Sequence, residues 1–263
     1  GGAVMGAPTP AGAGAAGGLA LELAKMRRLR TVLVATAVAA ATVALSGTDL
    51  FSADRADFAR PGSHMWEQLL LGYTLMSAIT GPVLAAVLAS RQTDIEHSGA
   101  GWTLFATAGR TPGSLCRAKL AALAVVVVPT VLVQSLALVA WARLSGVVVP
   151  LDALPWALYT AGLAAVDLAL CAFHVWLAAV VENQLVGVGV GLIGSFIGVY
   201  MLLAPPAVAR LVPWGYYAVI SCARQEGRTA LYTIPSLGWV AGFLVLAAVL
   251  FAVATRRLDR IER

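Results

Sequence analysis

Six long apolar runs constrain the fold of this chain more than any other feature of its sequence. They occupy residues 31–46, 66–89, 120–141, 154–181, 185–204 and 237–255. About 20 apolar residues are needed for a helix to cross a hydrocarbon core of about 30 Å. The runs are continuous, whereas strands of a membrane barrel alternate apolar and polar residues. We therefore expect an all-α integral membrane protein with six transmembrane helices.

The composition agrees with this expectation. Of the 263 residues, 60% are hydrophobic and 12% are charged, and the mean hydropathy is +0.84. A soluble domain is about half apolar and about a quarter charged. The excess of apolar side chains must face lipid, so we expect a multi-pass protein of the plasma membrane.

The basic residues indicate how the helices are oriented. Most of them lie before the first run, between the second and third runs, or after the sixth. These are Lys25, Arg27, Arg28, Arg30, Arg91, Arg110, Arg117, Lys119, Arg256, Arg257, Arg260 and Arg263. Cytoplasmic loops carry an excess of Lys and Arg, so both termini are predicted to be cytoplasmic, unless the basic residues are scattered by chance. The net charge of +5 then reflects topology, and no nucleic-acid partner is expected.

The first 30 residues divide into two parts. Residues 1–18 are Gly/Ala-rich, and we expect a flexible tail, followed by a single six-span membrane domain over residues 19–263. Residues 19–30 form an amphipathic segment that ends in basic residues. This segment either lies on the cytoplasmic leaflet as an interface helix or is a solvated lead-in to the first span.

The loop between the second and third spans contains an apolar patch. Residues 101–108 can form a short helix that carries Trp102, Leu104 and Phe105, and Thr111-Pro112 then starts a new helix. A short helix with an apolar face on a cytoplasmic loop is expected to dock on lipid or on a partner protein.

The fifth span carries a stripe of small residues. Gly187, Gly191, Gly194 and Gly198 share one helix face, which favours close helix packing over a ligand site. Prolines follow, and the stretch up to Gly227 is half apolar. We expect broken or re-entrant external helices there, before the sixth span.

The sequence predicts no catalytic site and no metal site. Its two lysines, Lys25 and Lys119, do not belong to a P-loop, and no HExxH, CxxC or GxSxG motif is present. The chain is therefore not expected to be an enzyme or to bind a cofactor. A membrane enzyme would need paired acids or a metal set at one interface, and the sequence contains neither.

One polar group lies deep in the fourth span. Asp167, Cys171 and His174 share a helix face, and a carboxylate at that depth marks either a functional or a tightly paired position. One interpretation is a proton relay in a proton-coupled secondary transporter. The other is an interhelical hydrogen bond, for which Gln134 is the candidate partner.

Three segments resemble permeases of type-2 ABC exporters, in particular the lantibiotic-immunity and bacitracin-resistance branch. The segment ELAKMRRLR (22–30) is similar to the E-x-x-K-x-x-R entry of that branch. The segment EHSGAGWTL (96–104), followed by Thr111-Pro112 and Lys119, resembles the coupling-helix pattern of the family. The third is LVPWG (211–215), ahead of the last span.

This resemblance implies a specific division of labour. The permease would work as a dimer, with a second copy or a homologous permease. Each copy would contact a separate ATP-binding subunit that holds ATP and Mg. The coupling residues would be Glu96, Gly101, Trp102, Leu104 and Phe105. The transported molecule would be an antimicrobial peptide or antibiotic, expelled for self-immunity or antibiotic resistance.

Overall fold

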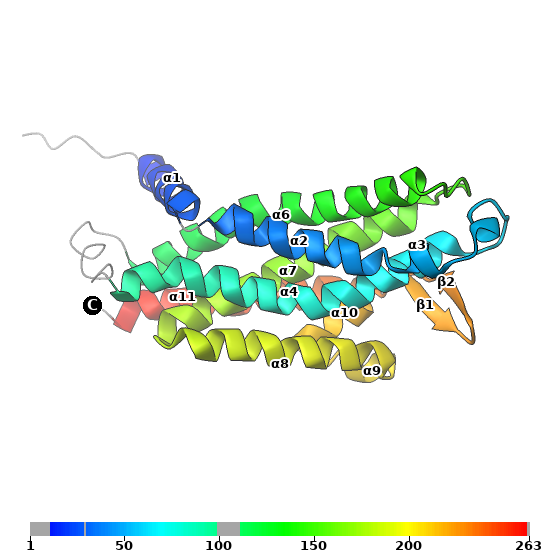
Figure 1. Cartoon of the computed structure of the whole chain (residues 1–263). Coiled ribbons are helices and arrows are strands. Elements are labelled where there is room, and N and C mark those ends of the chain that lie inside the picture. Colours follow the sequence, from blue (N-terminus) through cyan, green and yellow to red (C-terminus); the bar gives the residue numbers. More distant parts are fainter. Residues whose placement is uncertain (1–10, 29, 99–110, 262–263) are drawn as a thin grey trace, which may run out of the picture.

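Figure 1 shows the computed structural model of the chain, which describes residues 11–28, 30–98 and 111–261. The helices are α1 (Ala11–Arg28), α2 (Thr31–Ser46), α3 (Asp49–Ser52), η1 (Arg55–Phe58), α4 (Met65–Ser98), α6 (Pro112–Leu144), α7 (Ala153–Val180), α8 (Gln184–Leu203), α9 (Pro206–Ala209), η2 (Pro213–Gly215), α10 (Tyr216–Val219) and α11 (Leu237–Ile261). The strands are β1 (Ala223–Glu226) and β2 (Thr229–Tyr232).

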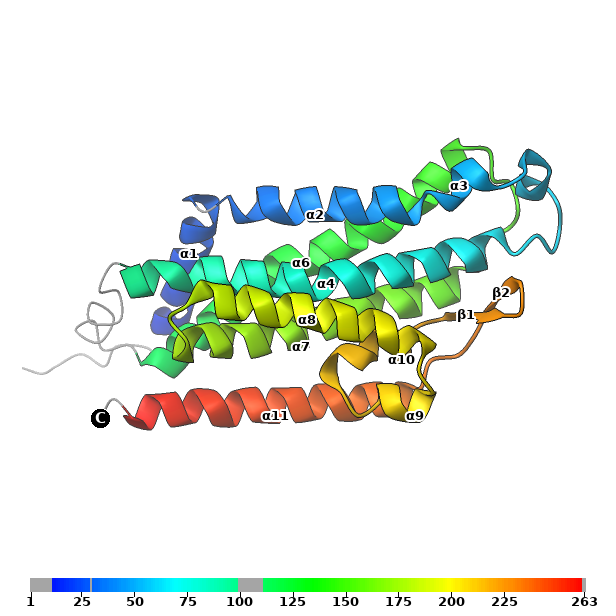
Figure 2. The ribbon, with the colours of Figure 1, turned by 60° about the horizontal axis from the view of Figure 1, so that its bottom comes forward.

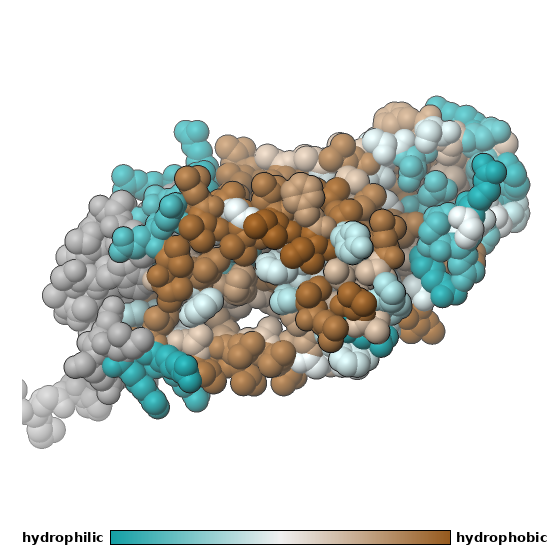
Figure 3. All heavy atoms as spheres, turned by 90° about the horizontal axis from the view of Figure 1, so that it is seen from below, coloured by the Kyte–Doolittle hydropathy of each residue, from teal (hydrophilic) through white to brown (hydrophobic). Residues whose placement is uncertain are grey.

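The prediction of six membrane-crossing helices is confirmed. By length and composition, α2 with α3, α4, α6, α7, α8 and α11 can each span a bilayer. On the face shown in Figure 3, hydrophobic atoms cover the middle of the molecule and hydrophilic atoms gather at its two ends. We call these ends the basic end, which holds α1 and the last turns of α4 and α11, and the hairpin end, which holds α3 and the β1–β2 hairpin (Figure 1).

Polar side chains cap the starts of three spans. Thr111 precedes α6, and its hydroxyl accepts a hydrogen bond from the backbone N–H of Ser114 at 3.3 Å. Asp152 and Asn183 cap α7 and α8 in the same way, each through the N–H two residues later. Such caps satisfy N–H groups that have no partner within the helix.

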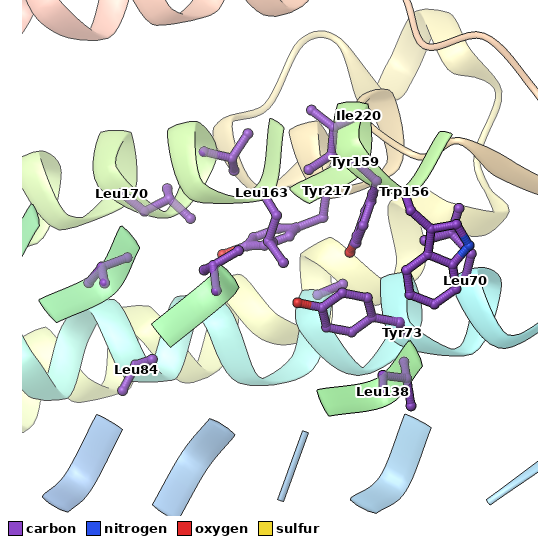
Figure 4. Packing of buried hydrophobic residues seen from close by; sticks show 14 of the residues in the cluster. Leu70, Tyr73, Leu84, Leu138, Trp156, Tyr159, Leu163, Leu170, Tyr217 and Ile220 are labelled. Atoms are coloured by element: carbon purple, nitrogen blue, oxygen red, sulfur yellow. The ribbon is translucent and has the colours of Figure 1, made fainter. Parts of the chain in front are cut away.

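The helix α4 occupies the centre of the bundle, with α2, α6, α7 and α8 packed around it. Figure 4 shows the core near the hairpin end, where Tyr73 of α4 meets Trp156 and Tyr159 of α7. Tyr217 of α10 reaches into the same layer from the side (Figure 4). In contrast, α11 lies along the edge of the bundle, and most of its side chains are exposed (Figure 2).

The segment before α11 contains the broken helices that we expected and one element that we did not expect. It does contain the short helices α9, η2 and α10, but an antiparallel hairpin of β1 and β2 follows them. Gly227, at the turn, has a φ of +59°, a conformation that glycine adopts readily and that suits a two-residue hairpin loop. The sequence analysis missed this hairpin because its strands are only four residues long.

The N-terminal segment also differs from expectation. The helix α1 begins at Ala11, within the stretch predicted to be a flexible tail, and it ends at Arg28. Figure 2 shows α1 running across the basic end of the bundle rather than along the spans. This orientation is the one expected for an interface helix.

Candidate coupling and transport sites

The predicted coupling residues fall largely outside the described part of the chain. Gly101, Trp102, Leu104 and Phe105 lie between α4 and α6, outside the described residues. Glu96 belongs to the last turns of α4, but its side chain is also outside them. What the structure does describe is how the two ends of this loop are held.

A buried charged cluster joins α1 to both helices that flank the loop. Glu22 of α1 and Lys119 of α6 are each almost fully buried, and Lys119 Nζ donates to Glu22 Oε2 at 3.1 Å. Lys119 Nζ also donates to the backbone oxygen of Gln92 in α4 at 2.7 Å, and Gln92 Nε2 donates to Glu22 Oε2 at 3.2 Å. Lys25 Nζ donates to the other carboxylate oxygen at 2.8 Å. We call these four residues the Glu22 clamp.

Burial determines how much this cluster contributes to the stability of the fold. Two opposite charges removed from water stabilise a fold only when close geometry and further hydrogen bonds compensate for their desolvation. Glu22 satisfies this condition, since three donors surround its carboxylate. Removing Glu22 or Lys119 would leave the other charge buried with fewer compensating contacts, so the clamp fixes α1 firmly against α4 and α6.

The start of α6 is also tied to the end of α11. The backbone N–H of Gly113 donates to Asp259 Oδ1 at 2.7 Å, and Arg117 lies 3.6 Å from the other carboxylate oxygen. Arg117 also donates to the hydroxyl of Thr255 at 3.2 Å. The first turns of α6 therefore connect the loop to the interface helix α1, through Lys119, and to the last membrane-crossing helix, α11.

The glycine stripe of α8 packs against α4 and Trp214 of the same chain. Gly187, Gly191, Gly194 and Gly198 are all buried. A Cβ added at Gly191 would lie 2.5 Å from Ala86 Cβ and 2.8 Å from the backbone oxygen of Pro82. A Cβ at Gly194 would overlap the Trp214 ring. The stripe is thus a close helix contact, of the kind that small residues permit in membranes.

No described residue of the chain covers the opposite face of α8. It presents large apolar side chains to the outside: Leu185, Leu192, Ile193, Phe196, Tyr200 and Leu203. In a membrane protein such a face meets lipid or another subunit. A contact of α8 with a second copy would therefore use this face and not the glycine stripe.

Asp167 has a partner, but not the one that we expected. The hydroxyl of Tyr217 in α10 donates to Asp167 Oδ1 at 2.6 Å, and both residues are buried. Gln134 instead accepts a hydrogen bond from Tyr73 at 3.1 Å. The prediction that Gln134 binds Asp167 is wrong, because Tyr217 reaches the carboxylate from the short helices that fold back at the hairpin end.

Further polar contacts tie α4, α6 and α7 together at this depth. Ser135 Oγ donates to the Tyr73 hydroxyl at 3.3 Å and lies 2.7 Å from the hydroxyl of Thr160. A cavity of about 10 Å³ lies nearby, lined by Asp167, Gln134 and Ser77 among others. That is about the smallest cavity that can hold one water molecule in a polar site. These groups can orient a buried water, but they hold no nucleophile paired with a base.

His174 does not join Asp167 in a relay. Its two ring nitrogens have no hydrogen-bond partner among the described residues, and the ring packs edge-on against Phe173 at 5.1 Å. Within the described residues, no group of His, Cys, Asp and Glu side chains could hold a metal ion. Asp167 and His174 are therefore two separate polar positions on α7.

All three cysteines are buried, which the sequence did not reveal. Cys116 lies in α6 and Cys171 in α7, while Cys222 lies just before β1. Burial raises the pKa of Cys222 to about 11. Because the thiolate is the reactive form, Cys222 is a poor target for labelling reagents at neutral pH.

Sequence reasoning missed two features that the structure brings together. Tyr217 could not be paired with Asp167, because the two lie 50 residues apart and on elements whose packing no pattern predicts. Glu22 and Lys119 each appeared in a segment that resembled a family motif, but nothing in the sequence placed them in contact. In both cases the sequence drew attention to a residue, but it did not indicate which residue the partner was.

The comparison with known families agrees with this architecture. Residues 19–198, more than half of the chain, match the family described as ABC-2 family transporter protein. No curated protein matched the sequence in a search for relatives. The matched part includes the Glu22 clamp, the loop after α4 and most of α8. This chain belongs to the ABC-2 transporter family, as a membrane-spanning permease subunit of an ABC transporter.

Proposed function

We propose that this permease is the membrane subunit of an ATP-driven exporter that expels a hydrophobic or amphipathic compound, such as an antimicrobial peptide or antibiotic. It works with a separate ATP-binding subunit, which holds ATP and Mg, and with a second permease copy. Export would provide self-immunity or antibiotic resistance. A path for such a substrate needs apolar walls and few buried charges, and the membrane-spanning helices of this chain have both.

The observation that carries this proposal is the Glu22 clamp. Gln92 lies about two turns before the end of α4, and Lys119 lies about two turns after the start of α6. Both bind Glu22, so a force applied to the loop between them acts on α1, α4 and α6 together. A rigid attachment at both ends of a loop is what transmission of a docking force requires.

The first test is the energy source. The chain and a candidate ATP-binding subunit would be purified together and placed in proteoliposomes with an amphipathic fluorescent substrate. We expect copurification, and transport that requires ATP and survives dissipation of the proton gradient. Transport that follows the proton gradient without any ATP-binding subunit would contradict the proposal.

A substitution tests the loop itself. Trp102→Ala removes a large aromatic anchor, a change that commonly costs about 2 kcal/mol or more in binding at interfaces. We expect a correspondingly weaker affinity for the ATP-binding subunit, measured by titration in detergent, while the permease itself unfolds at the same temperature. An unchanged affinity would mean that Trp102 does not contact the partner.

The orientation of the molecule can be tested with new cysteines, since the native ones are buried. We propose that the basic end is cytoplasmic. Glu182→Cys lies at the basic end and Arg228→Cys lies in the hairpin turn, and both positions are exposed. In intact cells, a membrane-impermeant maleimide should label Arg228→Cys and should reach Glu182→Cys only after lysis. The reverse pattern would invert the topology.

A further inference from the structure

A cavity of about 850 Å³ lies between α7 and α11. We call it the α7–α11 groove. Its walls are α7, the segment 210–216 and the inner face of α11. Figure 3 shows the hollow between α11, along the lower edge of the view, and the rest of the bundle.

Polar and aromatic contacts attach α11 to the bundle on either side of the groove. At the basic end, Asp259 binds Gly113 and Arg117. At the hairpin end, the Phe243 ring stacks on Tyr216 at 4.0 Å. The groove-lining positions of α11 include small residues. Gly238 and Gly242 face open space, since a Cβ at either would meet no atom within 4 Å.

The lining is almost entirely apolar, and its one charge lies at the hairpin end. Arg210 follows α9, its Nη2 donates to Ser236 Oγ at 2.9 Å, and its guanidinium lies 5.2 Å from the Trp239 ring centroid. Its Nε has no partner among the described residues, and none of the described residues that line the groove is acidic. The groove therefore combines a long apolar wall with a cation that has no acidic partner among the residues that the structure describes.

The length and position of the groove fit a lipid. Its lining runs along α11 from Gly238 to Ala254, about 24 Å at 1.5 Å per residue. One leaflet of the hydrocarbon core is about 15 Å thick, so the groove can accommodate acyl chains of full leaflet depth. Trp239 and Tyr216, near its hairpin end, are residue types that favour the headgroup level of a membrane.

We propose that the α7–α11 groove binds an anionic phospholipid of the surrounding bilayer, with its acyl chains along α11 and its phosphate at Arg210. An apolar groove that opens toward the bilayer cannot remain water-filled without cost, and lipid is the molecule present there at high concentration. The unpaired guanidinium then selects the charge of the headgroup, since Arg binds phosphate through several parallel donors. This proposal does not depend on what the permease transports.

The test measures lipid retention by the full-length chain. Purified protein would be exchanged into an equimolar mixture of phosphatidylglycerol and phosphatidylcholine, and the retained lipid would be identified by native mass spectrometry. We expect about a fivefold preference for phosphatidylglycerol, the ratio that corresponds to about 1 kcal/mol for one basic side chain near anionic lipid. Arg210→Gln should reduce the preference to about one, because it removes the positive charge and keeps a polar side chain at this position.

A matched pair of variants tests the groove itself. Ala247 lines the groove, whereas Ala248, the next residue of α11, is exposed and does not. Ala247→Phe should lower retention of both lipids at least fivefold, and Gly242→Leu should do the same by filling the same space. Ala248→Phe should retain lipid as the wild type does, and all variants should unfold at similar temperatures.

Several outcomes would overturn the proposal. Equal lipid retention by Ala247→Phe and Ala248→Phe would mean that the lipid is only an annular layer. An unchanged headgroup preference in Arg210→Gln would remove the role of the guanidinium. Loss of a dimer in Ala247→Phe, with no change in retained lipid, would assign the groove to a second copy of the chain.

Discussion

The helices α4 and α11 both cross the membrane, yet they occupy opposite environments. In its most apolar stretch, α4 has 56% of its residues buried, and α11 has 6%. The buried helix is the more polar of the two, since Tyr73, Thr74 and Ser77 all lie within α4 and are shielded by its neighbours. In lipid, polar side chains are tolerated only where protein surrounds them. The more buried of the two helices is therefore the less hydrophobic one.

The contacts at the basic end also differ between a buried side, next to α4, and an exposed side, next to α11. Substitutions in these contacts should have the largest effect on stability. Lys119→Ala leaves Glu22 buried without its main counter-charge on α6, which should lower the free energy of unfolding by about 3–5 kcal/mol. Arg117→Ala, two residues away, breaks the half-exposed contact with Asp259 on α11 and should cost at most about 1 kcal/mol. Denaturation of both variants in detergent micelles would compare them, and equal losses would break the contrast between the two sides.

The glycine stripe tests how closely α8 packs against α4. Gly191→Leu forces a side chain into a space where a Cβ already meets Ala86 and Pro82. Overpacking of this kind costs about 1–3 kcal/mol. Gly189→Leu on the same helix is the control, since a Cβ there meets nothing within 4 Å. A lower thermal unfolding midpoint is expected only for Gly191→Leu, and equal midpoints would contradict the packing described above.

Asp167 tests whether the polar layer beside α4 takes part in energy coupling. The amide oxygen of Asp167→Asn can still accept the hydrogen bond from Tyr217, so packing should be preserved. We expect ATP-dependent transport to remain within about tenfold of the wild type, a change of at most about 1.4 kcal/mol in the barrier. Complete loss of transport, with normal folding and normal binding of the ATP-binding subunit, would instead favour proton coupling through this carboxylate.

The smallest effect is expected on the outer face of α11. Val249 is exposed and does not line the groove. The side chain at this position faces lipid in both the wild type and Val249→Ala. The free energy of unfolding should therefore change by less than about 0.5 kcal/mol. A loss of 2 kcal/mol or more in a dimer-dissociation assay would show that another subunit covers this face.

Much of the fold follows from the sequence alone. The six spans were predicted because a membrane-crossing helix needs a long apolar run whatever its neighbours are. The packing stripe of α8 could also be recognised, because its four glycines recur on one helix face. The four-residue strands of the hairpin and the helical start of α1 at Ala11 could not be recognised. Short elements and Gly/Ala-rich helices leave too weak a local pattern.

The partners of the polar residues were decided only by the tertiary structure. Asp167 had to be paired or hydrated because of its depth, which is a property of sequence position. That Tyr217 and not Gln134 provides the hydrogen bond depends on α10 folding back between the spans. Likewise, Glu22 and Lys119 meet only because α1 crosses the end of the bundle. Hydropathy is set by each residue and its neighbours in the chain, whereas a hydrogen bond needs two side chains whose distance only packing determines.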